Sequence, residues 1–233
     1  YVPQPQNNRV SIFDLSTNTT RSPYAREEGK TVQTTTLTVQ RNPVAIAANL
    51  AGTYVYVVNR DSSSITVINS SNKTVQQSFS VCNQPIAAAV SRNDKKLYVA
   101  CQGDNSLSVI DTSNFSQLKL IQLNNRPSQM VISNGGRLYI MSTEGKTVQA
   151  LDTTSDERQL FTINTDVKDL DATESAGAPL AMSAQANDLL YVGATDGDVY
   201  SWHVTDPSNI TRQPRMKIQK KPSGVNGVKR TIK

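Results

Sequence analysis

Short runs of apolar and β-branched residues recur along the chain, and a polar turn separates each run from the next. Between residues 43 and 83 such runs cover residues 44–48, 54–59, 65–68 and 75–81, and turn-forming polar residues fill most of the gaps. Runs of this length that are bounded by turn residues predict β-strands. The segment therefore predicts four short antiparallel strands joined by tight turns.

This four-strand unit repeats with a nearly fixed period. Its reference prolines are 42, 42 and 52 residues apart, and its reference tyrosines are 42, 41 and 52 residues apart. These residues are Pro43, Pro85, Pro127 and Pro179, and Tyr56, Tyr98, Tyr139 and Tyr191. A period of about 40–45 residues with four strands in each unit is typical of β-propeller blades.

The repeat predicts an all-β protein that forms a single β-propeller domain. Four predicted blades cover residues 43–84, 85–126, 127–178 and 179–221, and a fifth combines residues 1–42 with residues 222–230. Pairing of the N-terminal and C-terminal strands in that fifth blade would close the ring and remove its two open sheet edges. The alternative is a fragment of a propeller that has more blades.

Motifs within the repeat resemble those of the YVTN-type β-propeller family. Residues 56–59 read Tyr-Val-Val-Asn and are the closest copy of the eponymous tetrapeptide, whereas residues 98–101 and 191–194 diverge from it. The resemblance covers nearly the whole chain and is weakest around residues 20–35 and 152–178. It implies an extracellular or cell-surface protein with lactonase-like relatives, and therefore no single activity.

The net charge of +5 is concentrated at the C-terminal end. Eight basic residues lie from Arg212 to Lys233 and no acidic residue follows Asp206, so residues 1–206 carry a net charge of −3. A basic tail can bind nucleic acid, but no aromatic side chains alternate with these charges to stack on bases. A solvated strand end or linker is the simpler interpretation, and we expect no nucleic-acid partner.

The hydropathy pattern predicts no membrane span, because no run approaches the roughly 20 apolar residues that a spanning helix needs. The chain opens at Tyr1 in the middle of a repeat. We therefore expect further sequence upstream, including any targeting segment.

The sequence offers little for catalysis or metal binding. His203 is the only histidine, and the chain has no nucleophile elbow, phosphate-binding loop or dinucleotide motif. Seven acidic residues between positions 152 and 174 could supply oxygen ligands to calcium, but the spacing of Asp166, Asp169 and Asp171 is not that of an EF-hand. A solvated insertion is the default interpretation of this stretch. We predict no catalytic residue, no metal site and no cofactor.

Cys82 and Cys101 are the only cysteines. Cys82 precedes a predicted first strand and Cys101 ends the adjacent second strand, so both lie near one face of the same blade. A disulfide is therefore geometrically possible, and two independent small buried residues are the alternative.

Five N-glycosylation sequons are present, at Asn18, Asn69, Asn72, Asn114 and Asn209. All except Asn69 fall in the turn that follows a third strand, where asparagine also suits the backbone geometry of the turn. Glycans at these positions would crowd the face opposite the cysteines.

The face that carries the cysteines is the candidate binding face, since propeller ligands usually meet loops held on a rigid scaffold. Its candidate binding residues are Arg41, Asn42, Arg60, Asp61, Gln84, Gln102, Asp104, Arg126, Glu144 and Asp196. Their mixed charge and hydrogen-bonding capacity suit a polar partner such as a protein or a glycan. Ordinary solvated loops are the alternative.

These features predict a non-catalytic extracellular or cell-surface module that binds or organises a partner through the loops of one face. One alternative is a lactonase-like enzyme with an acid-based site in the central channel, which a cluster of inward-facing carboxylates would favour. Another is a repeating subunit of a surface assembly, which large contacts between identical chains would favour.

Overall fold

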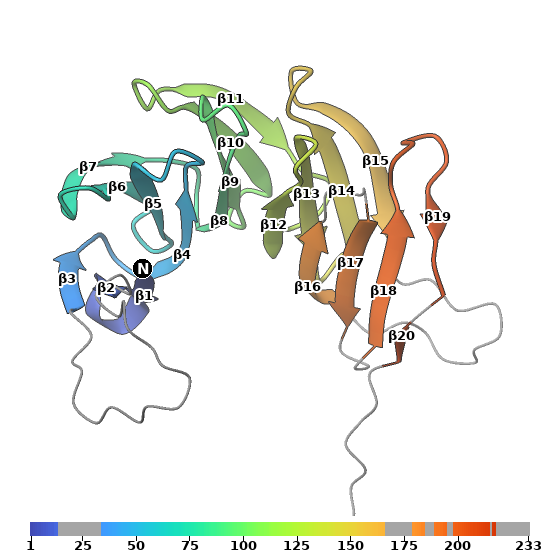
Figure 1. The fold of residues 1–233 in the computed structure, drawn as a ribbon, viewed down its shortest axis with the longest axis horizontal. Coiled ribbons are helices and arrows are strands. Elements are labelled where there is room, and N and C mark those ends of the chain that lie inside the picture. Colours follow the sequence, from blue (N-terminus) through green and yellow to red (C-terminus); the bar gives the residue numbers. More distant parts are fainter. Residues whose placement is uncertain (14–33, 166–178, 185–188, 195–197, 215, 218–233) are drawn as a thin grey trace, which may run out of the picture.

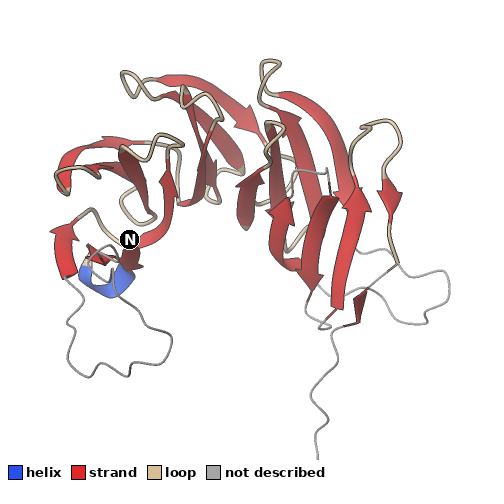
Figure 2. Ribbon diagram, viewed as in Figure 1, coloured by secondary structure: helices blue, strands red, loops and turns tan. Residues whose placement is uncertain are grey.

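The computed structural model describes residues 1–13, 34–165, 179–184, 189–194, 198–214 and 216–217. These residues form five antiparallel sheets that follow one another along a curved arc (Figure 1). The described residues contain a single helix, the short 3-10 helix η1 (Pro5–Asn7), and Figure 2 shows that strands make up the rest of the regular structure. No helix in this part of the chain is long and apolar enough to cross a membrane. The predicted all-β propeller fold is confirmed.

Each sheet is one blade, numbered here in chain order. Blade 1 contains β1 (Val2–Gln4), β2 (Arg9–Phe13) and β3 (Thr34–Thr38). Blade 2 contains β4 (Pro43–Ala48), β5 (Tyr54–Asn59), β6 (Ser64–Asn69) and β7 (Thr74–Ser80). Blade 3 contains β8 (Pro85–Val90), β9 (Lys96–Cys101), β10 (Ser106–Asp111) and β11 (Gln117–Gln122).

Blade 4 contains β12 (Gln129–Ile132), β13 (Arg137–Ser142), β14 (Thr147–Asp152) and β15 (Arg158–Asn164). Blade 5 contains β16 (Pro179–Ala184), β17 (Leu189–Ala194), β18 (Asp198–His203), β19 (Thr211–Arg212) and β20 (Met216–Lys217). In blade 5 the position of the fourth strand is shared by two short pieces, since β19 and β20 both pair with β18.

The strands of blades 2 to 4 pair in sequence order, and the first strand of each blade lies on the inner side of the arc (Figure 1). The first strands β4, β8, β12 and β16 pack successively against one another, and β1, the innermost described strand of blade 1, packs against β4. Because neighbouring sheets crowd together on this side, small alanine side chains in β4 and β8 relieve the overlap.

The hydrophobic core lies between neighbouring blades and is built mainly from their second and third strands. One buried cluster joins blades 2 and 3, another joins blades 3 and 4, and a third joins blades 4 and 5. The repeated tyrosines Tyr56, Tyr98 and Tyr139 are all buried in these layers. In contrast, the outermost strands β7 and β11 are largely exposed. This gradient explains why the repeat carries its aromatic residue in the second strand.

Turns between the third and fourth strands also connect the blades. Phe115 of blade 3 stacks on Phe79 of blade 2, with ring centroids 5.2 Å apart. The equivalent residue of blade 4, Glu157, reaches into blade 3, where it accepts hydrogen bonds from Lys96 Nζ (2.6 Å) and Tyr98 Oη (2.9 Å). Both turn residues adopt a positive φ, 60° at Phe115 and 56° at Glu157.

The buried position of Glu157 corrects one expectation from the sequence. The acidic stretch from residue 152 to residue 174 was expected to be solvated, but the Glu157 side chain is only 2% exposed and is paired with Lys96. The acidic residues Asp166, Asp169 and Asp171 lie outside the described residues.

Blade 1 has three described strands, and they correspond to the second, third and fourth strands of the other blades. Strand β1 pairs with β2 on one edge, and no other described strand pairs with its second edge. Blades 1 and 5 lie at the two ends of the arc (Figure 1). The segment 222–230, which is predicted to complete blade 1, lies outside the described residues, so ring closure stays a prediction.

Candidate functional site

The candidate binding face consists of two sets of turns, and we call it the loop face. One set joins the fourth strand of a blade to the first strand of the next, and the other joins second to third strands. Several residues in these turns have a positive φ, including Asn42 (54°), Gln84 (51°), Ser63 (47°), Asn105 (51°) and Lys146 (47°). Tight turns of this kind hold polar side chains at fixed positions above the sheets.

The loop face is hollowed between blades 1 and 2. The hollow has a volume of about 330 Å³ and is lined by Pro5, Gln6, Asn8, Arg41, Asn42 and Asp61. We call it the loop-face hollow. Three of the lining residues, Arg41, Asn42 and Asp61, are among the predicted binding residues, so the structure brings these three together.

Hydrogen bonds fix the polar side chains around this hollow. Asn8 Oδ1 accepts a hydrogen bond from the backbone N–H of Asn42 at 3.0 Å, which ties blade 1 to the start of blade 2. Asn42 Nδ2 donates to Asp61 Oδ1 at 3.0 Å, and Arg41 Nη2 donates to the backbone oxygen of Asp61 at 3.3 Å. These bonds hold a carboxylate, an amide and a guanidinium in one arrangement.

The same side chains keep hydrogen-bonding capacity for a bound molecule. A carboxylate has about four acceptor positions and a guanidinium has five N–H donors. Within the described part of the chain, the Asp61 carboxylate accepts only from Asn42, and the Arg41 guanidinium donates only to the Asp61 backbone. The loop-face hollow can therefore accept from and donate to the same ligand.

The lining residues Pro5, Gln6 and Asn8 were not predicted from the sequence. They belong to the turn between β1 and β2, which contains η1 and in which Asn8 has a φ of 52°. The repeat could have identified them, because this turn occupies the same place in blade 1 as residues 60–63 in blade 2.

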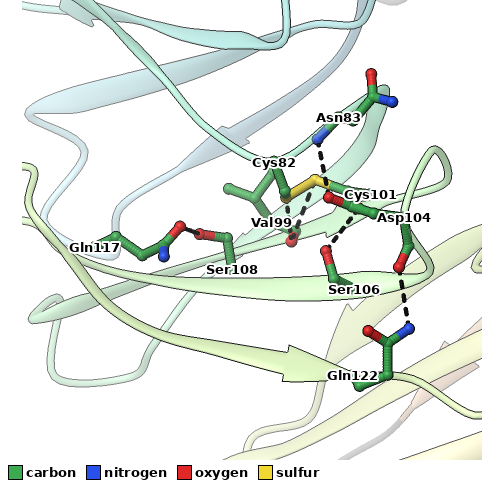
Figure 3. Close-up of a disulfide and its surroundings, with 9 residues drawn as sticks. All are labelled: Cys82, Asn83, Val99, Cys101, Asp104, Ser106, Ser108, Gln117 and Gln122. Carbon is green, nitrogen blue, oxygen red and sulfur yellow. Dashed lines mark hydrogen bonds between the residues drawn. A yellow bond between two sulfur atoms is a disulfide. The ribbon is translucent and has the colours of Figure 1, made fainter.

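In blade 3 the predicted residue Asp104 organises its own loop (Figure 3). Its Oδ1 accepts a hydrogen bond from Ser106 Oγ at 2.7 Å, and its backbone oxygen accepts one from Gln122 Nε2 at 3.0 Å. Asn83 packs closely over Gly103, where an added Cβ would lie 2.5 Å from the Asn83 amide nitrogen. Asp104 therefore has a structural role in this turn.

The same loop contains a disulfide bond between Cys82 and Cys101 (Figure 3). Their Cα atoms are 5.9 Å apart, and both residues are buried. The pairing joins the segment before β8 to the end of β9, at the loop face of blade 3. Of the two interpretations that the sequence left open, the structure shows the disulfide.

Removal of this disulfide is expected to lower the free energy of unfolding by about 3 kcal/mol, since the bond closes a loop between residues 19 positions apart and restricts the unfolded chain. Guanidinium denaturation of the double variant Cys82→Ser/Cys101→Ser would measure the loss. The reduced wild-type protein should match this variant. An unchanged denaturation midpoint after complete reduction would contradict the prediction.

In blade 4 the predicted residues Arg126 and Glu144 form an ion pair, with Nη1 and Oε1 3.1 Å apart. The Glu144 side chain is 71% exposed, so this pair adds little to stability. Asn125 beside it donates to Thr147 Oγ1 at 3.1 Å and packs over Gly145, as Asn83 packs over Gly103. An Asn-over-Gly contact is thus repeated on the loop face.

The other predicted residues do not converge on one site. Arg60 contributes its backbone N–H to Asn42, and Gln84 accepts from the backbone N–H of Gln102. The Gln102 side chain donates to the backbone oxygen of Pro127 at 2.9 Å and links blade 3 to blade 4. Asp196 lies outside the described residues. The structure therefore distributes the predicted residues blade by blade along the loop face.

Most sequons lie at the opposite end of the blades. Asn72 and Asn114 are exposed in the turns between third and fourth strands, and Asn209 is exposed before β19. Asn69 is half-buried, and its Oδ1 accepts from the backbone N–H of Ser71 at 3.0 Å. Asn114 Oδ1 accepts from the N–H of Ser116 at 2.9 Å, as expected for a turn-forming asparagine. Asn18 lies outside the described residues.

Comparison with known proteins identifies the fold and no family. No family model and no curated protein matches the sequence. Among solved structures, the chain is similar to a functionally unknown protein from Desulfotomaculum acetoxidans, at 12% identity over 94% of this chain and 65% of the other, with a TM-score of 0.71.

Two further structures show the same architecture. Hydrazine synthase of Kuenenia stuttgartiensis is similar at 20% identity over 74% of this chain and 67% of the other, with a TM-score of 0.56. The WD40 repeats of RRP9 are similar at 11% identity over 73% of this chain and 50% of the other, with a TM-score of 0.58. The chain thus spans between 50% and 67% of the lengths of these proteins. At these identities the likeness shows a β-propeller fold alone.

Proposed function

We propose that this chain is a non-catalytic interaction module that binds a polar partner, a glycan or a protein segment, through its loop face. The observation that carries the proposal is the loop-face hollow, where Arg41, Asn42 and Asp61 are held together with unused donors and acceptors. Because the turns already fix these side chains, binding would cost little ordering entropy.

The proposal places the protein outside the cell or on its surface. The resemblance of residues 56–59 to the YVTN-type repeat supports this location, and so does the disulfide, since disulfides persist in oxidising compartments. Glycans on Asn72, Asn114 and Asn209 would lie away from the loop face and leave it open to a partner.

The test is a binding screen followed by matched substitutions. Labelled protein would be applied to a glycan array and to an array of extracellular peptides, and each hit would be titrated against Asp61→Ala and Arg41→Ala. We expect each substitution to weaken binding by roughly 10-fold or more, as is usual when a partner loses a charged hydrogen bond. Arg92→Ala, at the opposite end of the blades, is the control and should bind normally.

Two results would contradict this proposal. One is a confirmed ligand whose affinity is unchanged in both loop-face variants, and the other is turnover of a lactone by the wild-type protein. The lactonase-like alternative has only the family resemblance as its support. A separate hollow lies beside strands β4, β8 and β12, and none of the described residues that line it carries a carboxylate.

A further inference from the structure

A second hollow lies on the inner side of the arc, at the end of the blades opposite the loop face. It has a volume of about 310 Å³, and we call it the central hollow. Its lining residues lie in or directly after strands β4, β8 and β12. Its apolar lining residues include Ala47, Ala48, Ala88, Ala89, Met130 and Val131. The hollow is therefore apolar in its interior and within the size range of small-molecule sites.

The rim of the central hollow is fixed by a contact between blades. Asp94 of blade 3 accepts hydrogen bonds from the backbone N–H groups of Leu50 (2.7 Å) and Ala51 (3.0 Å) in blade 2. Leu50 lines the hollow and is 69% exposed, so the turn holds a large apolar side chain in solvent at the rim. An apolar side chain held in this way extends the apolar surface that a ligand could contact.

Among the described residues that line this hollow, Arg92 is the one with a charged side chain. Its Nε donates to the backbone oxygen of Ser133 in blade 4 at 3.3 Å, which anchors the guanidinium at the rim. Among the described residues, no acceptor bonds its terminal nitrogens. Both carboxylate oxygens of nearby Asp94 are engaged by backbone N–H groups of blade 2, and Asp94 forms no ion pair with Arg92 in the described structure.

We propose that the central hollow binds a small amphiphile with an apolar body and an anionic head group. The apolar body would lie against the alanines of β4 and β8 and against Met130, where its burial is favourable. The head group would bind the terminal nitrogens of Arg92, because a guanidinium pairs well with a carboxylate or a phosphate. This site is separate from the loop-face hollow, so either proposal can fail without the other.

Calorimetric titration with octanoate tests the central hollow directly. Wild-type protein should bind octanoate saturably at one site, and octylammonium, which has the same body with a positive head, should bind at least about 10-fold more weakly. Arg92→Gln should weaken octanoate binding roughly 10-fold, because a charge-assisted hydrogen bond is lost. Arg41→Gln on the loop face is the matched control and should bind octanoate normally.

A second pair of variants tests the apolar wall. Ala48 is exposed at the end of β4, so Ala48→Leu should fill the hollow and abolish octanoate binding while the fold persists. Ala51→Leu places the same side chain in the adjacent turn, outside the lining, and should leave binding intact.

Several outcomes would overturn the proposal. They are the absence of saturable octanoate binding, equal affinity for octanoate and octylammonium, or unchanged octanoate binding in Arg92→Gln or Ala48→Leu. Sedimentation with phosphatidylglycerol vesicles distinguishes a free amphiphile from a membrane surface. Binding to vesicles without binding of octanoate would also overturn the proposal.

Discussion

Replacement of Glu157 by alanine is expected to lower the free energy of unfolding by about 4 kcal/mol, the scale found when one partner of a buried ion pair is removed. The Glu157 carboxylate bonds Lys96 Nζ and Tyr98 Oη across the boundary between blades 3 and 4. Its loss leaves the ammonium of Lys96, whose side chain is only 30% exposed, without its carboxylate partner. Guanidinium denaturation monitored by circular dichroism would measure the change.

Two further variants separate the ion pair from other causes. Glu157→Gln keeps the size of the side chain at a position with a φ of 56° but removes the charge. It should therefore lower the free energy of unfolding nearly as much as Glu157→Ala does. Glu144→Ala removes the exposed partner of Arg126 and should cost less than about 1 kcal/mol. If Glu157→Gln were as stable as the wild type, the interaction between charges would not be the cause.

The repeat allowed the fold to be predicted because each strand type has its own packing environment. Inner strands such as β4 need alanines where sheets crowd, and second strands such as β5 need a tyrosine where they diverge. The tyrosine recurs in blades 2 to 5 and the alanines are densest in β4 and β8, so these requirements leave a period in the sequence. The contact of Glu157 with Lys96 and Tyr98 does not repeat along the sequence. The equivalent turn position is Phe115 in blade 3 and Glu157 in blade 4, so the residue type differs from blade to blade.

The sequence predicted which end of the blades carries the candidate site, but it did not predict the hollow between blades 1 and 2. Hairpin connectivity alone places Arg41, Asn42 and Asp61 at the same end of blade 2. The hollow also needs Asn8 and η1 from blade 1, whose packing against blade 2 depends on contacts between residues distant in sequence. Sequence periodicity carries no information about such pairs, and the central hollow at β4, β8 and β12 was missed for the same reason.

Strong loss of stability is expected when the pH rises from about 10 toward 12, and the buried tyrosines are the cause. Burial, with the nearby charge of Asp94 as a smaller contribution, raises the pKa of Tyr56 to about 12. Burial, with Glu157 as its next cause, also raises the pKa of Tyr98 well above the ordinary value near 10.

The sign follows from proton release. Below pH 10 these tyrosines hold their protons in both states, so they add no pH dependence. Above pH 10 the unfolded chain releases protons that the folded protein keeps, and unfolding becomes more favourable as the pH rises. Each tyrosine lowers the free energy of unfolding by at most about 1.4 kcal/mol per pH unit, and the two together lower it by roughly 4 kcal/mol between pH 10 and pH 12.

Denaturation curves at successive pH values would measure how the free energy of unfolding changes with pH. Tyr→Phe variants would show how much each tyrosine contributes to this slope. Tyr56→Phe should reduce the slope near pH 11 by about 1 kcal/mol per pH unit, because phenylalanine has no proton to release. Tyr98→Phe should reduce the slope equally, but it should also lower stability at neutral pH, since it removes the hydrogen bond to Glu157. A wild-type slope in both variants would show that other groups drive alkaline unfolding and would contradict the role assigned to these buried tyrosines.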